Sequence, residues 1–516
     1  MPNVRVLLSA LAVAAAAACR VGPAGTPAPA RISTGSNAAL RAAIDSMADA
    51  PEFANAHWGI LIVDPEAGDT LYARNAGKLF MPASNMKILT SSTALAQLGP
   101  DFRYRTTFIA GGPVTDSVLH GDLVVIGRGD PSVSDHMFQD AMIPLRSVAD
   151  SLAARGVRHI AGRVVATGDA FPGEEFGYGW TYDDFESSYS APVDELLFNE
   201  GFSVLHVRGG DKPGDPVQVE TRPARRSPRV RVLATTANPV ASESIPARRN
   251  RGGPAGADLR VFKDSTTWDI VVDGQIAPHD TVVLDVTHHD PDEAYLAAVR
   301  EALADRGITV DETAAASPAG DGALGGGERT SGDTLVALVS PPLRDILKAL
   351  LKPSQNQIAE MLFRTIALER FGTGRTDSAR VAIQAQIASW GVPAPEAVVR
   401  DGSGLSRYDY VSPRALVHVL DAMRKVPSFD VFYDALPIAG VDGTTRNRMK
   451  GTPAEGNVHA KTGSVALARS LSGYVTTADH HMLIFSFLCN NWTTPVASVE
   501  RVQDAIAARL AAMRLR

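Results

Sequence analysis

The stretch PASNMKILTSST, residues 82–93, decides how the rest of the chain is interpreted. It places Ser84 and Lys87 three positions apart, directly after a proline and ahead of an apolar run that predicts a helix. Residues i and i+3 lie on the same face of a helix, so the hydroxyl and the amine can come within hydrogen-bonding reach. The stretch is therefore either the polar start of an ordinary buried helix or a serine nucleophile with its general base.

The second interpretation sets a condition on the lysine. An ordinary lysine amine has a pKa of about 10.4 and is protonated at pH 7, so it cannot accept a proton there. Burial and neighbouring cations would have to lower the pKa of Lys87 to about 7. A catalytic role for Lys87 therefore predicts a second cation close to it.

Two further short motifs each occur once in the chain. S-Q-N at residues 354–356 stands at the entry to a predicted helix, and K-T-G at residues 461–463 stands at the start of a predicted strand pair. Each alone is also what a helix cap or a turn requires. Together with Ser84 and Lys87, and in this order, they match the motif set of penicillin-binding proteins and class A β-lactamases.

The motif set predicts a role for each polar side chain. Ser84 attacks a carbonyl carbon and Lys87 accepts its proton. Ser354 relays that proton to the leaving amine, while Asn356 helps to hold Lys87 and the substrate amide. Lys461 supplies the second cation.

Four further groups of the site follow from the same set. Thr462, together with the lysine before it, binds a substrate carboxylate, and Gly463 lets the substrate backbone pass close to the strand. The backbone N–H groups of Ser84 and Ser464 form an oxyanion hole.

Beyond the motifs, the chain resembles the class C low-molecular-mass penicillin-binding proteins, the D-alanyl-D-alanine carboxypeptidase/endopeptidase family, over nearly its whole mature length. The segments that carry the resemblance are GDLVVIGRGDPSVS, GYGWTYDDFESSYSAP, SPPLRDILKALLKPSQNQIAE, RDGSGLSRYDYVSP, LPIAGVDGTTRNR and HAKTGSVALARSLSGYV. The resemblance implies a serine D,D-peptidase, without a cofactor, that cleaves D-Ala-D-Ala ends or D-Ala–meso-diaminopimelate cross-links of peptidoglycan. It also implies covalent inhibition by β-lactam antibiotics.

The resemblance and the apolar patterning agree on a multidomain α/β fold. We expect a transpeptidase-like, β-lactamase-like catalytic domain made of two segments, 37–100 and 338–516. Between them, residues 101–337 hold many short strand-like runs and few helices, which predicts a β-rich insertion with two subdomains.

A side pocket for the meso-diaminopimelate end of the substrate is also implied by the resemblance. Asp184 would meet its ammonium group, Tyr189 would pack against it, and Arg407 would meet its carboxylate. Two positions depart from the common family pattern: Gln355 stands where an aspartate is frequent, and Ala466 stands where some members have a polar side chain. The second departure leaves the fine specificity open.

The N-terminus predicts export. Residues 1–18 combine an arginine, a short apolar run and small residues before Cys19, as in a signal peptide, and residues 19–36 have the composition of a flexible tether. Lipid attachment at Cys19 and plain cleavage after residue 18 both stay open, and both lead to the periplasm. Only one other cysteine exists, Cys489, which lies in an apolar run and is predicted to be a buried strand residue.

Charge and composition exclude several classes of partner and site. A formal net charge of -7 argues against a nucleic-acid binder. The arginine-rich run 222–231 is predicted to be a solvated loop or strand edge. Twelve histidines without an HExxH pattern or paired ligand spacing give no support for a metal site. Whether the protein forms a homodimer is left open.

Two rival functions use the same residues differently. One is a non-catalytic peptidoglycan-binding or scaffolding lipoprotein, although a pure binder needs neither Ser84 nor Lys87. The other is a β-lactamase-like hydrolase, which needs a base for deacylation. The sequence ELLFN at residues 195–199 imitates the glutamate loop of class A β-lactamases, but it precedes S-Q-N instead of following it, so we interpret it as a chance match.

Overall fold

The computed structural model describes residues 38–185, 187–237, 258–311 and 332–515. The predicted signal peptide, Cys19 and the tether lie outside the described residues. Within the part of the chain that is described, no helix is both long and apolar enough to span a bilayer.

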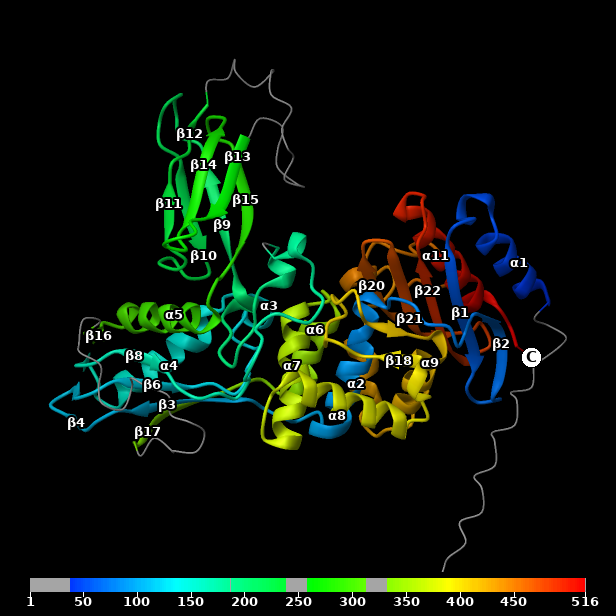
Figure 1. The fold of residues 1–516 in the computed structure, drawn as a ribbon, viewed down its shortest axis with the longest axis horizontal. Coiled ribbons are helices and arrows are strands. Elements are labelled where there is room, and N and C mark those ends of the chain that lie inside the picture. The colour runs from blue at the N-terminus through cyan, green and yellow to red at the C-terminus, as the bar shows by residue number, and fades with distance from the viewer. Residues whose placement is uncertain (1–37, 186, 238–257, 312–331, 516) are drawn as a thin grey trace, which may run out of the picture.

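The catalytic motifs sit in a body built on a five-stranded antiparallel sheet (Figure 1). The strand order is β2-β1-β22-β21-β20, so strands from near the two ends of the chain pair at the centre, where β1 lies beside β22. The strands are β1 (His57–Asp64), β2 (Asp69–Arg74), β20 (His459–Val465), β21 (Ala468–Thr476) and β22 (Met482–Asn490). Edge strand β20 therefore carries the K-T-G motif.

Helices cover both faces of this sheet and create two cores. Side chains alternate along β22, so that Ile484 and Leu488 join one core while Phe485 and Phe487 join the other. The prediction that Cys489 is a buried strand residue is confirmed, since it lies in the second core. The second core is closed by α1 (Ala38–Ala48) and α11 (Val496–Ala512), and the first by α2 (Met86–Leu98), α6 (Leu343–Leu351), α7 (Asn356–Phe371), α8 (Thr376–Ser389), α9 (Pro413–Arg424) and α10 (Phe429–Ala435).

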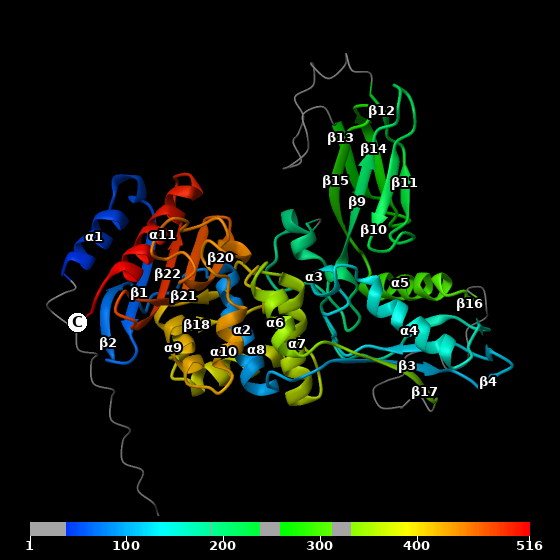
Figure 2. The same cartoon turned by 180° about the vertical axis from the view of Figure 1, so that it is seen from behind.

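After α2 the chain leaves this body and returns through a neighbouring strand. β3 (Arg105–Ala110) pairs antiparallel with β17 (Thr334–Val339), and the sheet continues through β6 (Leu123–Ile126) and β8 (Val164–Ala166). A small second sheet contains β4 (Val114–Thr115), β5 (Val118–Leu119), β7 (His159–Ile160) and β16 (Thr309–Val310). Apolar residues of α4 (Met142–Ala154) and α5 (Pro291–Asp305) pack with these strands in one core. Figures 1 and 2 place this unit at the opposite end of the molecule from α1 and α11.

A third unit projects from the second one and consists of two facing sheets (Figure 1). Residues of β9 and β14, such as Leu205 and Val272, meet in its core. One sheet contains β9 (Phe202–Arg208), β10 (Gln218–Arg222) and β15 (Thr281–Thr287), and the other β11 (Val230–Val232), β12 (Thr235–Thr236), β13 (Asp258–Lys263) and β14 (Ile270–Ile276).

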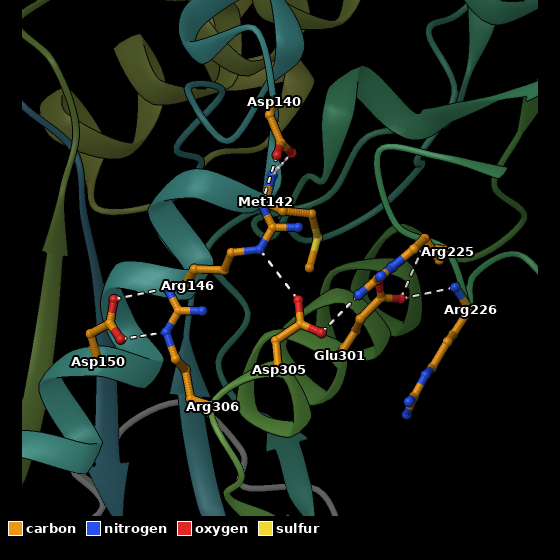
Figure 3. A network of polar contacts seen from close by, with 9 residues as sticks. All are labelled: Asp140, Met142, Arg146, Asp150, Arg225, Arg226, Glu301, Asp305 and Arg306. Atoms are coloured by element: carbon orange, nitrogen blue, oxygen red, sulfur yellow. Dashed lines mark hydrogen bonds and ion pairs between the residues drawn. The ribbon is translucent and has the colours of Figure 1, made fainter.

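The arginine-rich run joins the third unit to α5 (Figure 3). The buried carboxylate of Glu301 accepts the backbone N–H groups of Arg225 at 3.0 Å and of Arg226 at 2.8 Å. The Arg225 side chain, which is 64% exposed, also contacts Glu301 and Asp305. The run is thus solvated, as predicted, but it also fixes the loop between β10 and β11 against a helix.

Candidate active site

Ser84 lies in a tight turn immediately before α2. Residues Ala83–Asn85 form a single 3₁₀ turn and the α-helix begins at Met86, so Ser84 is not inside the regular helix that the sequence predicts. Ala83 has a φ of +48°, a conformation that is unfavourable for a residue with a Cβ. The i, i+3 relation still brings Lys87 Nζ to 3.0 Å from Ser84 Oγ.

Lys87 is fully buried and makes three polar contacts. Its Nζ lies 3.0 Å from Ser84 Oγ, 2.6 Å from Asn356 Oδ1 and 2.8 Å from the carbonyl oxygen of Ser403. Burial lowers the pKa of Lys87 to about 7, against the opposing influence of three nearby carboxyl groups. A substantial share of this amine is therefore uncharged at neutral pH, which is the condition that a general base has to meet.

Lys461, on strand β20, lies close enough to Lys87 to feel its charge. It is also fully buried, and its Nζ donates to Ser354 Oγ and to the carbonyl oxygen of Thr462, both at 2.8 Å. Burial, and after it the charge of Lys87, lowers the pKa of Lys461 well below its ordinary value. We expected burial and a neighbouring cation together to lower the pKa of Lys87. In the structure burial is the main cause for both amines, and the charge of the neighbouring lysine contributes at Lys461.

The S-Q-N motif forms the entry to α7. Ser354 has a φ of +69°, Gln355 is the N-cap, and Asn356 is the first helical residue. Asn356 accepts from Lys87 through its oxygen and donates through Nδ2 to the carbonyl oxygen of Tyr189 at 2.7 Å. It therefore ties Lys87 to the loop that carries Tyr189.

Gly463 brings strand β20 against the turn that carries Ser84. A Cβ placed on Gly463 would lie 2.1 Å from Ser470 Oγ, 2.6 Å from the carbonyl oxygen of Pro82 and 3.0 Å from the backbone nitrogen of Ser84. Real Cβ atoms do not approach other atoms so closely, so only glycine fits here.

Residues 401–409 complete the environment of Lys87; the sequence analysis named Arg407 in this loop but not the carboxyl groups that hold it. Glu360 lies one helical turn after Asn356 on α7, and its buried carboxylate accepts the backbone N–H groups of Gly402 and Ser403. This fixes the Ser403 carbonyl that accepts from Lys87. Burial and the neighbouring Asp401 raise the pKa of Glu360 to about 7.

Two more buried carboxyl groups shape the same loop. Asp401 accepts the backbone N–H groups of Gly404 and Ser406 at 2.7 Å and the indole N–H of Trp180 at 2.9 Å. Asp409 accepts the backbone N–H of Arg400 at 2.6 Å, and burial raises its pKa well above the ordinary value. The available signal was the Asp-Gly-Ser-Gly sequence, which is typical of a tight turn, with acidic residues at both ends.

The three side-pocket candidates line the same cleft as Ser84, which has a volume of about 1020 Å³. Tyr189 Oη donates to Asp184 at 2.6 Å, and Arg407 Nη2 lies 4.0 Å from the other oxygen of that carboxylate. Arg407 Nη1 also donates to the carbonyl oxygen of Ala466 at 3.3 Å. The structure thus brings a carboxylate, a phenol and a guanidinium together beside the nucleophile.

Thr462 and Ser464 line the cleft along the edge of β20. Thr462 Oγ1 lies 2.7 Å from Thr444 Oγ1, and Ser464 Oγ accepts from Arg469. Arg469 and Trp492, which also line the cleft, were not singled out from the sequence.

Other candidates lie away from the cleft or have a structural role. Glu195 is buried in the insertion and does not line the cleft; its pKa is raised to about 8 by burial and by Asp194. His459 stacks on the ring of Tyr433 with 3.9 Å between ring centroids. Among the residues that the structure describes, no three His, Cys, Asp or Glu side chains are grouped so that they could hold a metal ion.

Comparison with known proteins adds a family and relatives to this geometry. A family model described as the D-Ala-D-Ala carboxypeptidase 3 (S13) family matches residues 40–513. A D-alanyl-D-alanine carboxypeptidase of Actinomadura sp. (strain R39) is 33% identical over 482 residues, covering 92% of this chain and 84% of that protein. The D-alanyl-D-alanine carboxypeptidase DacB of Haemophilus influenzae is 25% identical, covering 81% of this chain and 82% of that protein.

Solved structures show the same fold. The crystal structure of penicillin binding protein 4 (dacB) from Haemophilus influenzae superposes with a TM-score of 0.74 at 23% identity, covering 91% of this chain and 99% of that chain. A structure of the same protein complexed with a β-lactam gives a TM-score of 0.70 at 22% identity, covering 91% of this chain and 99% of that one. The predicted penicillin-binding, β-lactamase-like α/β fold is therefore confirmed.

Proposed function

The chain belongs to the D-Ala-D-Ala carboxypeptidase 3 (S13) family of serine-type hydrolases, and we propose that it cleaves D,D-peptide bonds of peptidoglycan through an acyl-enzyme on Ser84. The contact between Ser84 Oγ and Lys87 Nζ, at 3.0 Å with the amine fully buried, carries this proposal. A buried amine with a pKa near 7 can take the serine proton at the pH at which the enzyme works.

In the proposed mechanism two serines and two lysines share the proton transfers. Ser84 Oγ attacks the carbonyl carbon of the penultimate D-Ala while Lys87 takes its proton. Ser354, in contact with Lys461, gives its proton to the leaving amine as the C–N bond breaks, and the proton that Lys87 took restores it. Water then hydrolyses the ester on Ser84 and restores its hydroxyl. The tetrahedral oxygen is held by the backbone N–H groups of Ser84 and Ser464, and the closeness of Gly463 to the Ser84 nitrogen supports this arrangement.

The substrate proposal extends to the residue that precedes D-Ala. A meso-diaminopimelate side chain ends in an ammonium and a carboxylate, and the cleft offers the carboxylate of Asp184 and the guanidinium of Arg407 about 4.0 Å apart. Tyr189 would pack against the chain between them. We propose that this pocket selects such stem peptides, and that both terminal D-Ala and D-Ala–meso-diaminopimelate cross-links are cleaved.

Three finer parts of the proposal concern the whole protein. The catalytic domain comprises residues 37–100 and 338–516, with 101–337 as an insertion of two subdomains. Residues 1–18 direct export to the periplasm, followed either by lipid attachment at Cys19 or by plain cleavage after residue 18. The protein is either a monomer or a homodimer. Membrane fractionation of a Cys19→Ser variant and light scattering of the purified protein test the last two parts.

A fluorescent penicillin tests the proposed activity. We expect covalent labelling of the purified protein, loss of labelling in Ser84→Ala, and full labelling in Ser389→Ala, a matched change of an exposed serine on α8. Absence of labelling in folded wild-type protein would favour a non-catalytic binder. D-Ala released from a pentapeptide, with slow release of the penicillin label, separates a peptidase from a β-lactamase.

A further inference from the structure

The cleft continues over the edge of β20 onto the side of the sheet that α11 covers. Ser464 on β20 lies opposite Arg469 on β21, and opposite residues of an antiparallel pair have side chains on the same face. The next residue, Ser470, faces the other way and donates to the carbonyl oxygen of Pro82. Arg469 therefore approaches the cleft from the α11 face, and both Arg469 and Ser464 line it together with Ser84.

Arg469 is held in place by groups on its far side. Its guanidinium carbon lies 6.0 Å from the centre of the Trp492 ring, and its Nε lies 3.5 Å from a carboxylate oxygen of Glu500 on α11. The side chain is 19% exposed, so part of it reaches the open cleft. This packing limits the positions available to the guanidinium, which donates through Nη1 to Ser464 Oγ.

The hydrogen bond from Arg469 makes Ser464 Oγ an acceptor on one side and leaves its hydroxyl free to donate on the other. A serine hydroxyl has one hydrogen and two lone pairs, and a guanidinium has donors only. Because Arg469 occupies a lone pair of Ser464 Oγ, the hydroxyl hydrogen is available to an acceptor in the cleft. Thr462 presents a second hydroxyl two residues along the same edge, and alternate residues of a strand share a face.

We propose that Arg469 is a positioning residue for substrate selection: through Ser464 it directs a hydroxyl hydrogen at the carboxylate of the residue that leaves. This makes the enzyme prefer a leaving residue that carries a carboxylate next to its amine over one that carries an amide. The inference rests on the proposed function, because that carboxylate belongs to the D,D-peptide substrate.

Two matched substrates test the proposal. Both are meso-diaminopimelate peptides that end in D-Ala-D-Ala, one with a free C-terminal acid and the other with a C-terminal amide. We expect Arg469→Gln to lower kcat/KM for the acid about tenfold, mainly through KM, because the Ser464 hydroxyl is no longer directed at the substrate carboxylate and that charge-assisted hydrogen bond is lost. For the amide we expect kcat/KM to change less than about twofold. Arg501→Gln is the control, since Arg501 donates to Ser498 Oγ on α11 and does not line the cleft; it should change neither substrate.

A double-mutant cycle separates positioning from a merely structural role. Ser464→Ala should reproduce the loss on the acid, and the double variant should lose little more, because Arg469 acts through Ser464. Losses that add independently, or an equal loss on both substrates, would overturn the proposal. If Arg469→Gln does not fold, Arg469→Met keeps the apolar stem against Trp492 and replaces it in the cycle. Failure of the wild type to hydrolyse the acid would instead refute the proposed function.

Discussion

The catalytic body and the insertion treat their positive charges in opposite ways. In the body, Lys87 and Lys461 have no exposed surface, and they lie close enough for the charge of Lys87 to act on Lys461. In the insertion, Arg225 and Arg229 are 64% and 78% exposed and each contacts an acidic side chain. Burial of a charge costs several kcal/mol per ion, roughly, whereas an exposed ion pair contributes about 0–1 kcal/mol. Burial of the two lysines therefore lowers the stability of the body and makes their amines reactive. In the insertion, exposed arginines instead hold loops in place through ion pairs.

The largest expected effect comes from making the buried base permanently charged. Lys87→Arg should slow acylation by penicillin by roughly 10²–10⁴-fold, the usual contribution of a general base, because a guanidinium stays protonated at any accessible pH. The rate of covalent labelling measures this. Lys78→Arg, on the exposed segment before the site, is the control and should label at the wild-type rate. A Lys87→Arg enzyme that is acylated normally would remove Lys87 from the role of base.

The pH dependence of the acylation rate tests the same buried lysine, with smaller expected changes in rate. The pKa of Lys87 is lowered to about 7, and the proposed mechanism uses the uncharged form as the base. The acylation rate should therefore be level above about pH 7 and fall about tenfold for each pH unit below it, to roughly a hundredth at pH 5. A rate that stays constant from pH 5 to pH 9 would contradict a titrating base in this range.

Within the insertion, the largest effect is expected at its buried carboxylate. Glu301→Ala removes the acceptor for the N–H groups of Arg225 and Arg226 and should weaken that junction by about 1–3 kcal/mol. Hydrogen exchange at these two amides measures the local opening. Labelling by penicillin should stay at the wild-type rate, because Glu301 does not line the cleft. Unchanged amide protection would show that the junction is held by other contacts.

The smallest effect is expected at an exposed pair. Arg229 Nε lies 3.0 Å from Asp269, with 78% of the arginine side chain exposed. Arg229→Ala should change the free energy of unfolding by less than about 1 kcal/mol, and less still at high salt. Urea denaturation at two salt concentrations checks this. A loss of stability as large as that expected for Glu301→Ala would show that buried and exposed charges in the insertion contribute equally.

Much of the fold and the family could be predicted because short motifs occur in a fixed order along the chain. The residues that the motifs single out form two hydrogen-bonded groups, one of Lys87 with Ser84 and Asn356 and the other of Lys461 with Ser354. Ser84, Ser354 and Asn356 line one cleft.

What the sequence analysis missed depends on tertiary packing. Glu360 is an ordinary acidic residue on a helix until α7 places it under the backbone N–H groups of Gly402 and Ser403, more than one element away in sequence. Arg469 is likewise an unremarkable strand residue until β21 sets it opposite Ser464. The 3₁₀ turn at Ser84 was missed because the apolar periodicity of α2 extends up to it and gives no sign of where the regular helix begins.

The pairing of β3 with β17 has a further consequence for what could be cut from this protein. Arg105 faces Val339 across one rung of the ladder, a separation of about 5 Å, so a short hairpin could bridge the whole excursion without disturbing its base. However, the segment between these two strands includes the loop that carries Trp180 and Tyr189. Trp180 donates to Asp401, and the carbonyl oxygen of Tyr189 accepts from Asn356. A minimal enzyme made by closing that hairpin would keep its sheet and lose one wall of its cleft.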